Sequence, residues 1–185
     1  MKFVAALLLA VTVVACGGSD KPTTSPANNS FADASCADLA AWAATVQPAF
    51  NDAQQSGSLD ATGTKRLGQE LAQAAQATGK LADGIAARPA PDLESGDAAK
   101  TTIVTTLNQL KQLAQQTADE IAAFDFANAT NDQAKKLKSD LVALTTSVAD
   151  SLSTLAPILT DSPLRSALEN STTCRQAGAQ LVGSS

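Results

Sequence analysis

Small and apolar residues recur at steps of three and four along the chain from about residue 36 onward. This is the spacing of amphipathic helices, in which the buried side chains share one face. Ser162 followed by Pro163 is a typical helix start before the last of these stripes. The stripes predict five helices, which cover residues 36–53, 67–85, 103–124, 134–155 and 164–181. Because their connections are short, the sequence predicts an all-α fold, an up-and-down helical bundle of four to five antiparallel helices.

Glycine and proline are expected to weaken some of these helices. Gly68, Gly79 and Gly84 fall in the second predicted helix, and each costs roughly 1 kcal/mol relative to alanine where it is exposed. This helix is therefore expected to depend on packing for its stability. Pro48 lies in the first helix and Pro157 in the fourth, and each is expected to kink or end its helix because proline removes a backbone hydrogen bond.

The N-terminus has a different pattern. A single lysine, Lys2, precedes a nearly continuous apolar run over residues 3–14. The run is too short for an ordinary membrane-spanning helix, which needs about 20 apolar residues. A short apolar run behind a basic residue is typical of an export signal that is removed from the mature protein.

Cys16 closes this segment in a specific context, with the aliphatic Val13 three residues before it, the small Ala15 directly before it and Gly17 after it. The motif resembles the lipobox of a bacterial lipoprotein signal peptide, of the actinobacterial or mycobacterial type. The resemblance implies removal of residues 1–15 and attachment of a lipid to Cys16. It also implies a protein anchored to the extracytoplasmic side of the cell membrane. The alternative is an ordinary secretory signal followed by a chance cysteine.

The residues after Cys16 are rich in Gly, Ser, Thr, Pro and Asn and show no apolar periodicity. Such a composition cannot bury enough surface to fold, and we expect a flexible tether over residues 16–32. A chain of about a dozen such residues separates its ends by ~20 Å. The remaining residues, 33–185, are long enough for one domain with a hydrophobic core.

Cys36 and Cys174 are the two cysteines left if Cys16 carries lipid. An even pair in an exported protein predicts one disulfide, which would fasten the first predicted helix beside the fifth. Two free buried thiols are the alternative. In a five-helix up-and-down bundle these two helices run parallel, so the fifth would have to be staggered. Zinc is not expected, since the spacing is wrong and the chain has no histidine.

The absence of histidine also removes most catalytic arrangements, including Ser-His-Asp and Cys-His sites. Asp119, Glu120 and Asp125 form the densest acidic group, but they resemble the solvated face of an amphipathic helix more than a pair of catalytic carboxylates in a cleft. No glycine-rich phosphate loop or calcium-binding loop is present. The sequence therefore predicts neither an enzyme nor a bound cofactor or metal.

Charge narrows the class of partner. Without Lys2 the chain has 12 basic and 18 acidic side chains, a net charge of −6, which disfavours nucleic acid. Lys135, Lys136 and Lys138 form the one basic cluster. A solvated helix face explains this cluster best, and contact with anionic lipid or an acidic partner is the alternative.

Aromatic residues are scarce, at 3% of the chain, and four of them fall on the first and third predicted helices: Trp42, Phe50, Phe124 and Phe126. These two helices run in the same direction, so the last three residues are expected at the end of the bundle away from the membrane. Aromatic side chains supply much of the energy of recognition, and these four are candidate contacts for a partner or ligand. Simple packing of the core is the alternative.

Two classes of function remain. The first is a non-catalytic, membrane-anchored surface lipoprotein whose helical bundle is an interaction or structural module of the cell envelope, with another envelope protein as its partner. The second is a carrier that binds a hydrophobic small molecule or lipid between its helices. A carrier needs an apolar pocket of roughly 300 Å³ or more. Seams rich in Ala and Thr allow close helix approach instead, which favours the first class.

Overall fold

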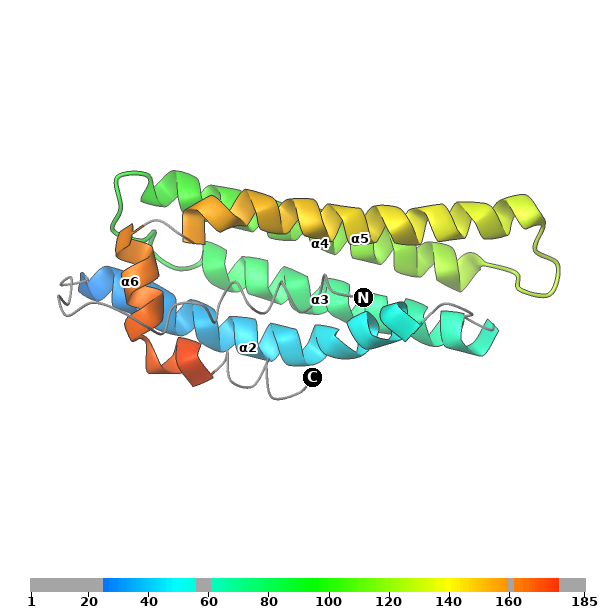
Figure 1. The fold of residues 1–185 in the computed structure, drawn as a ribbon, viewed down its shortest axis with the longest axis horizontal. Coiled ribbons are helices and arrows are strands. Elements are labelled where there is room, and N and C mark those ends of the chain that lie inside the picture. The colour runs from blue at the N-terminus through cyan, green and yellow to red at the C-terminus, as the bar shows by residue number, and fades with distance from the viewer. Residues whose placement is uncertain (1–24, 56–60, 160–161, 177–185) are drawn as a thin grey trace.

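The structure is a computed structural model that describes residues 25–55, 61–159 and 162–176 (Figure 1). Within these ranges the chain is almost entirely helical and contains no strand. The labelled helices of the described ranges have the bounds α2 Pro26–Gln55, α3 Ala61–Ala86, α4 Gly96–Ala123, α5 Asn131–Leu159 and α6 Ser162–Asn170, and a short helical segment follows at residues 172–176. The prediction of an all-α helical bundle is therefore confirmed.

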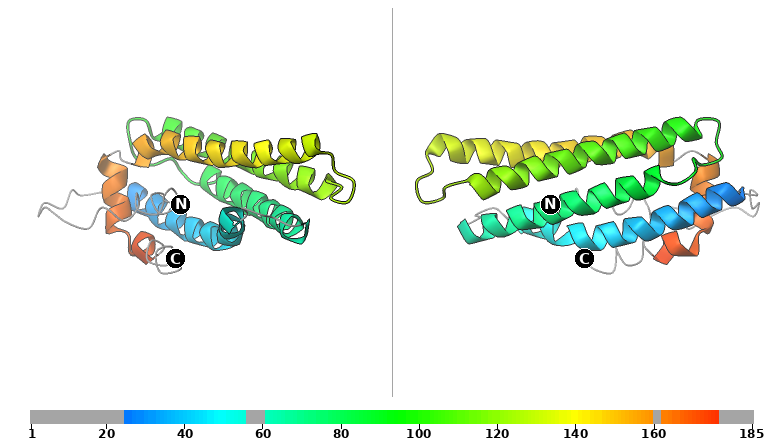
Figure 2. Two further views of the ribbon diagram at one scale, coloured as in Figure 1. Left: turned by 45° about the vertical axis from the view of Figure 1, so that its right-hand side comes forward. Right: turned by 180° about the vertical axis from the view of Figure 1, so that it is seen from behind.

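The four long helices run alternately up and down, side by side (Figures 1 and 2). α3 packs most extensively on α4 and also on α2, whereas α5 packs mainly on α4. α6 lies across one end of the bundle and contacts α2. The expectation that the last helix runs parallel to the first is thus wrong. The helix breaks at Ser171 after nine residues, too few to run along a neighbour of 30 residues.

The apolar stripe of α3 forms the centre of the core. Its six predicted inward residues are all buried: Leu67, Leu71, Ala74, Thr78, Leu81 and Ile85. One cluster of the core lies near α6 and includes Leu81, Leu107 and Leu164, while a second includes Leu67, Ile121 and Leu144. The predicted packing of the second helix is therefore observed, and its glycines lie within a well-buried helix.

α2 begins earlier than the sequence predicts. Its first turn starts at Pro26, and the Ser25 hydroxyl accepts a hydrogen bond from the backbone N–H of Asn28 at 3.2 Å, as an N-cap does. Asn28 is only 2% exposed. Its side chain accepts from the backbone N–H of Asp92 at 2.7 Å and donates to the Asp92 carbonyl at 3.2 Å. The tether predicted for residues 16–32 is therefore too long, since residues 26–32 belong to the folded domain.

Other helix ends also differ from the prediction. Neither proline ends its helix, since α2 continues past Pro48 to Gln55 and α5 continues past Pro157. α4 ends at Ala123, one residue before the predicted end at Phe124. The backbone of Phe124 is extended, with φ −76° and ψ 121°, so this aromatic residue belongs to the connection between α4 and α5.

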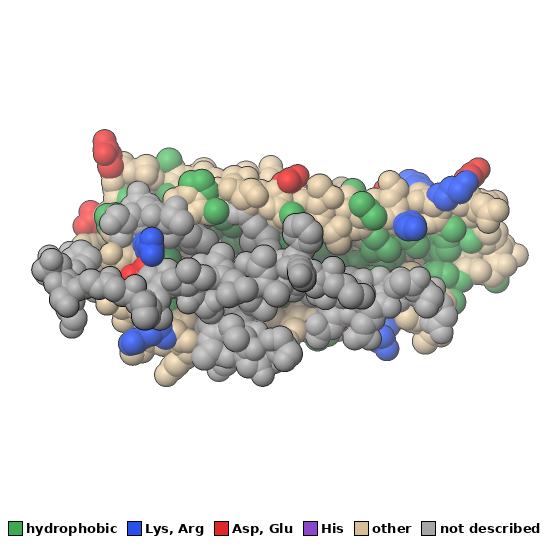
Figure 3. Space-filling model, in the orientation of Figure 1, with side chains coloured by type: hydrophobic (Ala, Val, Ile, Leu, Met, Phe, Trp, Pro, Cys, Tyr) green, Lys and Arg blue, Asp and Glu red, His purple; other side chains and the backbone are tan. Residues whose placement is uncertain are grey.

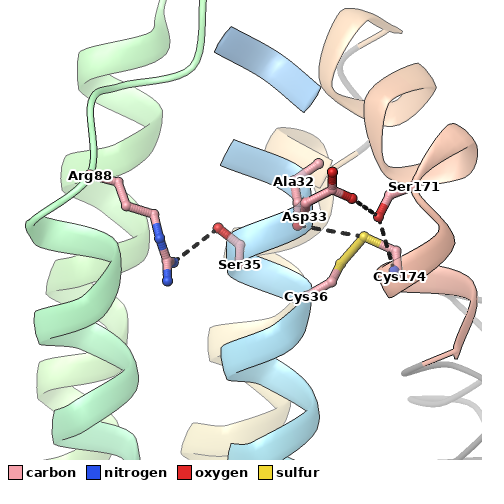
Figure 4. Close-up of a disulfide and its surroundings, with 7 residues drawn as sticks. All are labelled: Ala32, Asp33, Ser35, Cys36, Arg88, Ser171 and Cys174. Atoms are coloured by element: carbon pink, nitrogen blue, oxygen red, sulfur yellow. Dashed lines mark hydrogen bonds between the residues drawn. A yellow bond between two sulfur atoms is a disulfide. The ribbon is translucent and has the colours of Figure 1, made fainter. Parts of the chain in front are cut away.

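The disulfide joins Cys36 of α2 to Cys174, with their Cα atoms 4.9 Å apart (Figure 4). Both cysteines are buried. The predicted disulfide is formed, and it lies between α2 and the segment that follows α6. Ser171 supports this position, because its hydroxyl donates to Asp33 and accepts the backbone N–H of Cys174 at 3.0 Å. On the other side of α2, Arg88 at the end of α3 donates to Ser35 at 3.3 Å.

The close approach of α3 and α4 predicts opposite effects for two Gly→Ala substitutions. A Cβ atom at Gly68 would lie 2.7 Å from Cγ2 of buried Ile121, whereas one at Gly79 would meet only the flexible end of Lys111, at 3.1 Å or more. Alanine gains about 1 kcal/mol of helix propensity at both sites. Overpacking costs typically 1–3 kcal/mol. We expect Gly68→Ala to lower the free energy of unfolding, and Gly79→Ala to raise it or leave it unchanged.

Urea unfolding followed by circular dichroism measures both variants. Equal stabilisation by the two substitutions would show that α3 and α4 are not in close contact at Gly68.

The disulfide generates a second prediction. It closes a loop with a sequence separation of 138 residues, for which the chain-entropy model gives up to about 5 kcal/mol of stabilisation. Reduction is expected to lower the free energy of unfolding by several kcal/mol and to increase amide hydrogen exchange first in α6, which contacts mainly α2.

The control is the double variant Cys36→Ala with Cys174→Ala, in which a reducing agent should change neither quantity. Recovery of two alkylatable thiols at Cys36 and Cys174 from the native protein, without prior reduction, would contradict the bridge.

Candidate functional site

The candidate site is the connection between α4 and α5, which lies at the end of the bundle opposite Pro26 (Figure 1). Asp125 shapes this connection. Its carboxylate accepts the backbone N–H of Ala127 at 3.0 Å and the side-chain amide of Asn128 at 2.9 Å. The hydrogen bond from Asn128, together with the one from Ala127, lowers the pKa of Asp125. The ionised carboxylate therefore organises the turn that carries the neighbouring aromatic residues.

A capping box fixes the other side of the connection. The backbone N–H of Thr130 donates to the side chain of Gln133 at 2.8 Å, and the backbone N–H of Gln133 donates to the Thr130 hydroxyl at 3.3 Å. This reciprocal pair satisfies two backbone N–H groups at the start of α5. Both ends of the connection are thus held by local hydrogen bonds.

Phe124 and Phe126 form an edge-to-face pair in this connection. Their ring centroids are 4.7 Å apart, with an angle of 60° between the rings. The ammonium group of Lys65, at the start of α3, lies 5.9 Å from the centroid of Phe126. Both rings are only partly buried and belong to neither main core cluster. The end of the bundle therefore presents apolar area beside a cation.

The structure does not bring Trp42 to this site. Trp42 lies midway along α2 and packs against the core cluster near α6. Its indole N–H donates to the Thr78 hydroxyl of α3 at 2.9 Å, and Thr78 in turn donates to the Ala74 carbonyl at 2.8 Å. Trp42 therefore acts as a packing residue between α2 and α3.

Two other predicted residues cannot be assigned to the site from their side chains. The backbone of Phe50 lies in the last turns of α2, but its side chain lies outside the description. Cys16 lies outside the described residues, as does the segment 1–15 for which the sequence predicts a signal peptide.

The basic cluster near this end is partly neutralised. Lys136 donates to Asp140 at 2.7 Å and to Glu120 of α4 at 3.1 Å, and these hydrogen bonds raise the pKa of Lys136. Lys135 lies 3.7 Å from Asp132. These exposed pairs contribute little stability, but they reduce the positive potential that an anionic partner would require.

In the part of the chain that the structure describes, no three or more Asp, Glu or Cys side chains lie close enough together to hold a metal ion. Asp119 accepts from Gln115 of its own helix at 2.8 Å. Glu70 packs beside Arg66 and Asp52, and burial raises the pKa of Glu70, with a further contribution from the charge of Asp52. One Glu70 oxygen is buried without a hydrogen-bond partner among the described residues. Ionised Glu70 therefore costs stability as the pH rises through its pKa.

α5 is the least buried of the long helices. Among its described residues only Leu144 is buried, and Val142 is 56% exposed. From Leu141 to the end of the helix Asp150 is the only charged residue, and in Figure 3 charged side chains gather nearer the other end of α5. By length and composition Asn131–Ile158 could also cross a membrane. Core helices of soluble proteins can have the same length and composition. The length and composition of α5 therefore do not show whether it inserts into a membrane.

None of the family models, curated proteins or solved structures compared with this chain matches it. The sequence predicts Phe124 and Phe126 as contact residues, and the structure brings them together, but the sequence does not indicate Lys65 or the structural role of Asp125. Asp125 and Asn128 lie between two predicted helices, and this pair is a turn signal that could have identified the structural role of Asp125.

The partial exposure of Phe126 generates a prediction about stability. Phe126→Ser is expected to change the free energy of unfolding by no more than about 1 kcal/mol, because the ring lies outside the main core clusters. The control is Ile121→Ala in the adjacent core, where the side chain is 1% exposed and truncation should cost about 2–5 kcal/mol.

Both variants can be compared by urea unfolding. If Phe126→Ser destabilises the protein as much as Ile121→Ala does, Phe126 is a core residue, and the connection between α4 and α5 should be abandoned as a candidate site.

Proposed function

We propose that this chain is a non-catalytic lipoprotein of the cell envelope. In this proposal a lipid on Cys16 anchors the protein to the extracytoplasmic side of the membrane. The helical bundle then serves as an interaction module that presents Phe124 and Phe126 to another envelope protein.

The observation that carries the proposal is the aromatic pair at the end of the bundle. Energetically important residues of protein interfaces are enriched in aromatic and basic side chains and lie in rigidly supported positions. Phe124 and Phe126 are partly exposed, Lys65 lies over one of the rings, and Asp125 fixes the turn between the two helices. This combination supports protein recognition.

The position of the pair agrees with an anchor at Cys16. α2 starts at Pro26, so nine residues separate Cys16 from the start of α2. A flexible segment of that length spans ~15–18 Å. The end of the bundle that contains Pro26 would therefore stay near the bilayer, and the aromatic pair would project away from it by the length of the helices, about 40 Å.

A carrier of apolar ligands is less well supported. The groove between α4 and α5 has a volume of about 380 Å³, which is large enough for a small ligand, but Leu113 is the one apolar residue among the nine that line it. Several apolar residues of α5, including Leu141, Leu144 and Leu155, pack against the core clusters instead. The second class of function, which requires an apolar pocket, therefore gains no support from this groove.

The proposal is tested by photo-crosslinking in the native host. A photoreactive phenylalanine analogue at position 126 is expected to form a crosslink to one discrete envelope protein, identified by mass spectrometry. The same analogue at position 142 is the matched control, because Val142 is an exposed apolar residue on the side of α5. Position 142 should give no such product.

The Cys16→Ser variant tests the anchor in the same cells. It is expected to lose incorporation of a fatty-acid label and to leave the membrane fraction, while the folded domain keeps its helical content. Fatty-acid labelling that persists in Cys16→Ser would refute the anchor. Identical crosslinks from positions 126 and 142 would refute the proposed recognition site at Phe124 and Phe126.

A further inference from the structure

The last turns of α2 follow a proline inside the helix. Pro48 has no backbone N–H, so α2 lacks one hydrogen bond of its backbone ladder at this point, and helices bend most readily where such a bond is missing. Ala49 belongs to a core cluster, and Asp52 is the one residue beyond it whose side chain the structure describes. Among the described side chains, a small apolar group and a carboxylate therefore hold the segment 49–55 on the bundle.

Asp52 meets two charged residues that lie one turn apart on α3. The Arg66 Nε donates to the Asp52 carboxylate, and the same nitrogen lies 3.8 Å from Oε1 of Glu70. One guanidinium group thus faces two carboxyl groups. The side chain of Arg66 is 61% exposed, whereas that of Glu70 is 18% exposed. Because water screens the exposed guanidinium, its attraction for a second carboxylate is weak.

The surroundings of Glu70 favour its protonated form. Its Oε2 atom is buried without a hydrogen-bond partner among the described residues. Burial raises the pKa of Glu70 most, the charge of Asp52 raises it further, Arg66 opposes this rise, and a hydrogen bond with Asp52 adds to it. These two residues of α2 and α3 are the charged groups that act on Glu70 within the described ranges, and none from α4 or α5 does so. A proton on Glu70 removes the repulsion between the carboxylates and provides the donor for their hydrogen bond.

We propose that Asp52, Arg66 and Glu70 form a pH-sensitive latch, in which a proton taken up from solvent by Glu70 holds the last turns of α2 on α3. When Glu70 loses this proton, the two carboxylates repel each other, and the segment 49–55 opens about Pro48. The latch is separate from the aromatic pair and depends on neither Phe126 nor a lipid on Cys16.

The direction of the pH dependence follows from the raised pKa. The closed latch binds the proton of Glu70 more tightly than an open segment does, in which this carboxyl group has its ordinary pKa of 4.5. Closure is therefore favoured most below pH 4.5, and this contribution is lost as the pH rises through the raised pKa of Glu70.

The test uses the full chain and amide hydrogen exchange, with protection factors corrected for the pH dependence of intrinsic exchange. We expect residues 49–55 to lose protection as the pH rises from below 4.5 to neutral. Residues 26–45 of the same helix are the internal control and should keep their protection. Carboxyl carbon NMR measures the proton directly, and the titration midpoint of Glu70 is expected above its ordinary value.

Glu70→Gln keeps the shape of the side chain and a hydrogen-bond donor but cannot ionise, so it is expected to protect residues 49–55 at every pH. Glu94→Gln is the matched control, because Glu94 is exposed in the connection between α3 and α4 and its replacement should leave the pH dependence unchanged. Asp52→Asn removes the neighbouring negative charge and is expected to lower the titration midpoint of Glu70.

Three results would overturn the latch. The first is the same pH dependence of protection in the wild-type chain and in Glu70→Gln. The second is a Glu70 midpoint at or below the ordinary value, or one that Asp52→Asn leaves unchanged. The third is a loss of protection that residues 26–45 share equally with residues 49–55, because the pH would then act on the whole bundle.

Discussion

The packing of α3 on α4 is the contact on which the remaining architecture depends. The absence of a side chain at Gly68 lets Ile121 lie against the backbone of α3, where even a Cβ atom would be 2.7 Å from its Cγ2. Ile121 joins the cluster that contains Leu67 and Leu144. Close packing of this kind gives dispersion contacts that a looser seam between helices would lose. α2 then covers one side of this pair of helices.

α5 is held by a weaker set of contacts than α3 and α4 are. Its apolar stripe reaches the core through Leu144, but it meets α4 partly through the amide and hydroxyl groups of the polar groove. A seam of this composition contributes less to stability than an apolar one, because its polar groups exchange hydrogen bonds with water for little net gain. Along this seam α5 therefore has weaker packing and a more polar surface.

The two ends of the bundle are stabilised in different ways. At the end that contains Pro26, long-range contacts dominate: the disulfide fastens the segment after α6 to α2, and Asn28 fastens the start of α2 to Asp92. At the other end the connection between α4 and α5 depends on local bonds from Asp125 and Thr130. A connection that is locally fixed and carries partly exposed aromatic rings can recognise a partner with little loss of conformational entropy.

The sequence by itself determined the elements and the class of fold. The periodic stripes placed the C-terminal ends of α3 and α4 to within one residue, because periodicity reports burial, but they began six and seven residues after the helices do. Ser25 with Pro26 is the same start signal as Ser162 with Pro163, but it lies in a polar composition that indicates a tether. Phe31 and Ala32 are buried against parts of the chain far away in sequence, and that contact makes the segment helical.

Only the tertiary structure decided how the faces are used. The separation of Trp42 from Phe126, the crossing of α6 over the bundle end and the polar groove beside α5 each depend on which helices become neighbours. Periodicity shows that a helix has an inward face but not which residues lie opposite that face. The sequence therefore determined the helices and the cysteine pair, while packing decided which side chains meet, because contact between distant segments is a property of the folded chain.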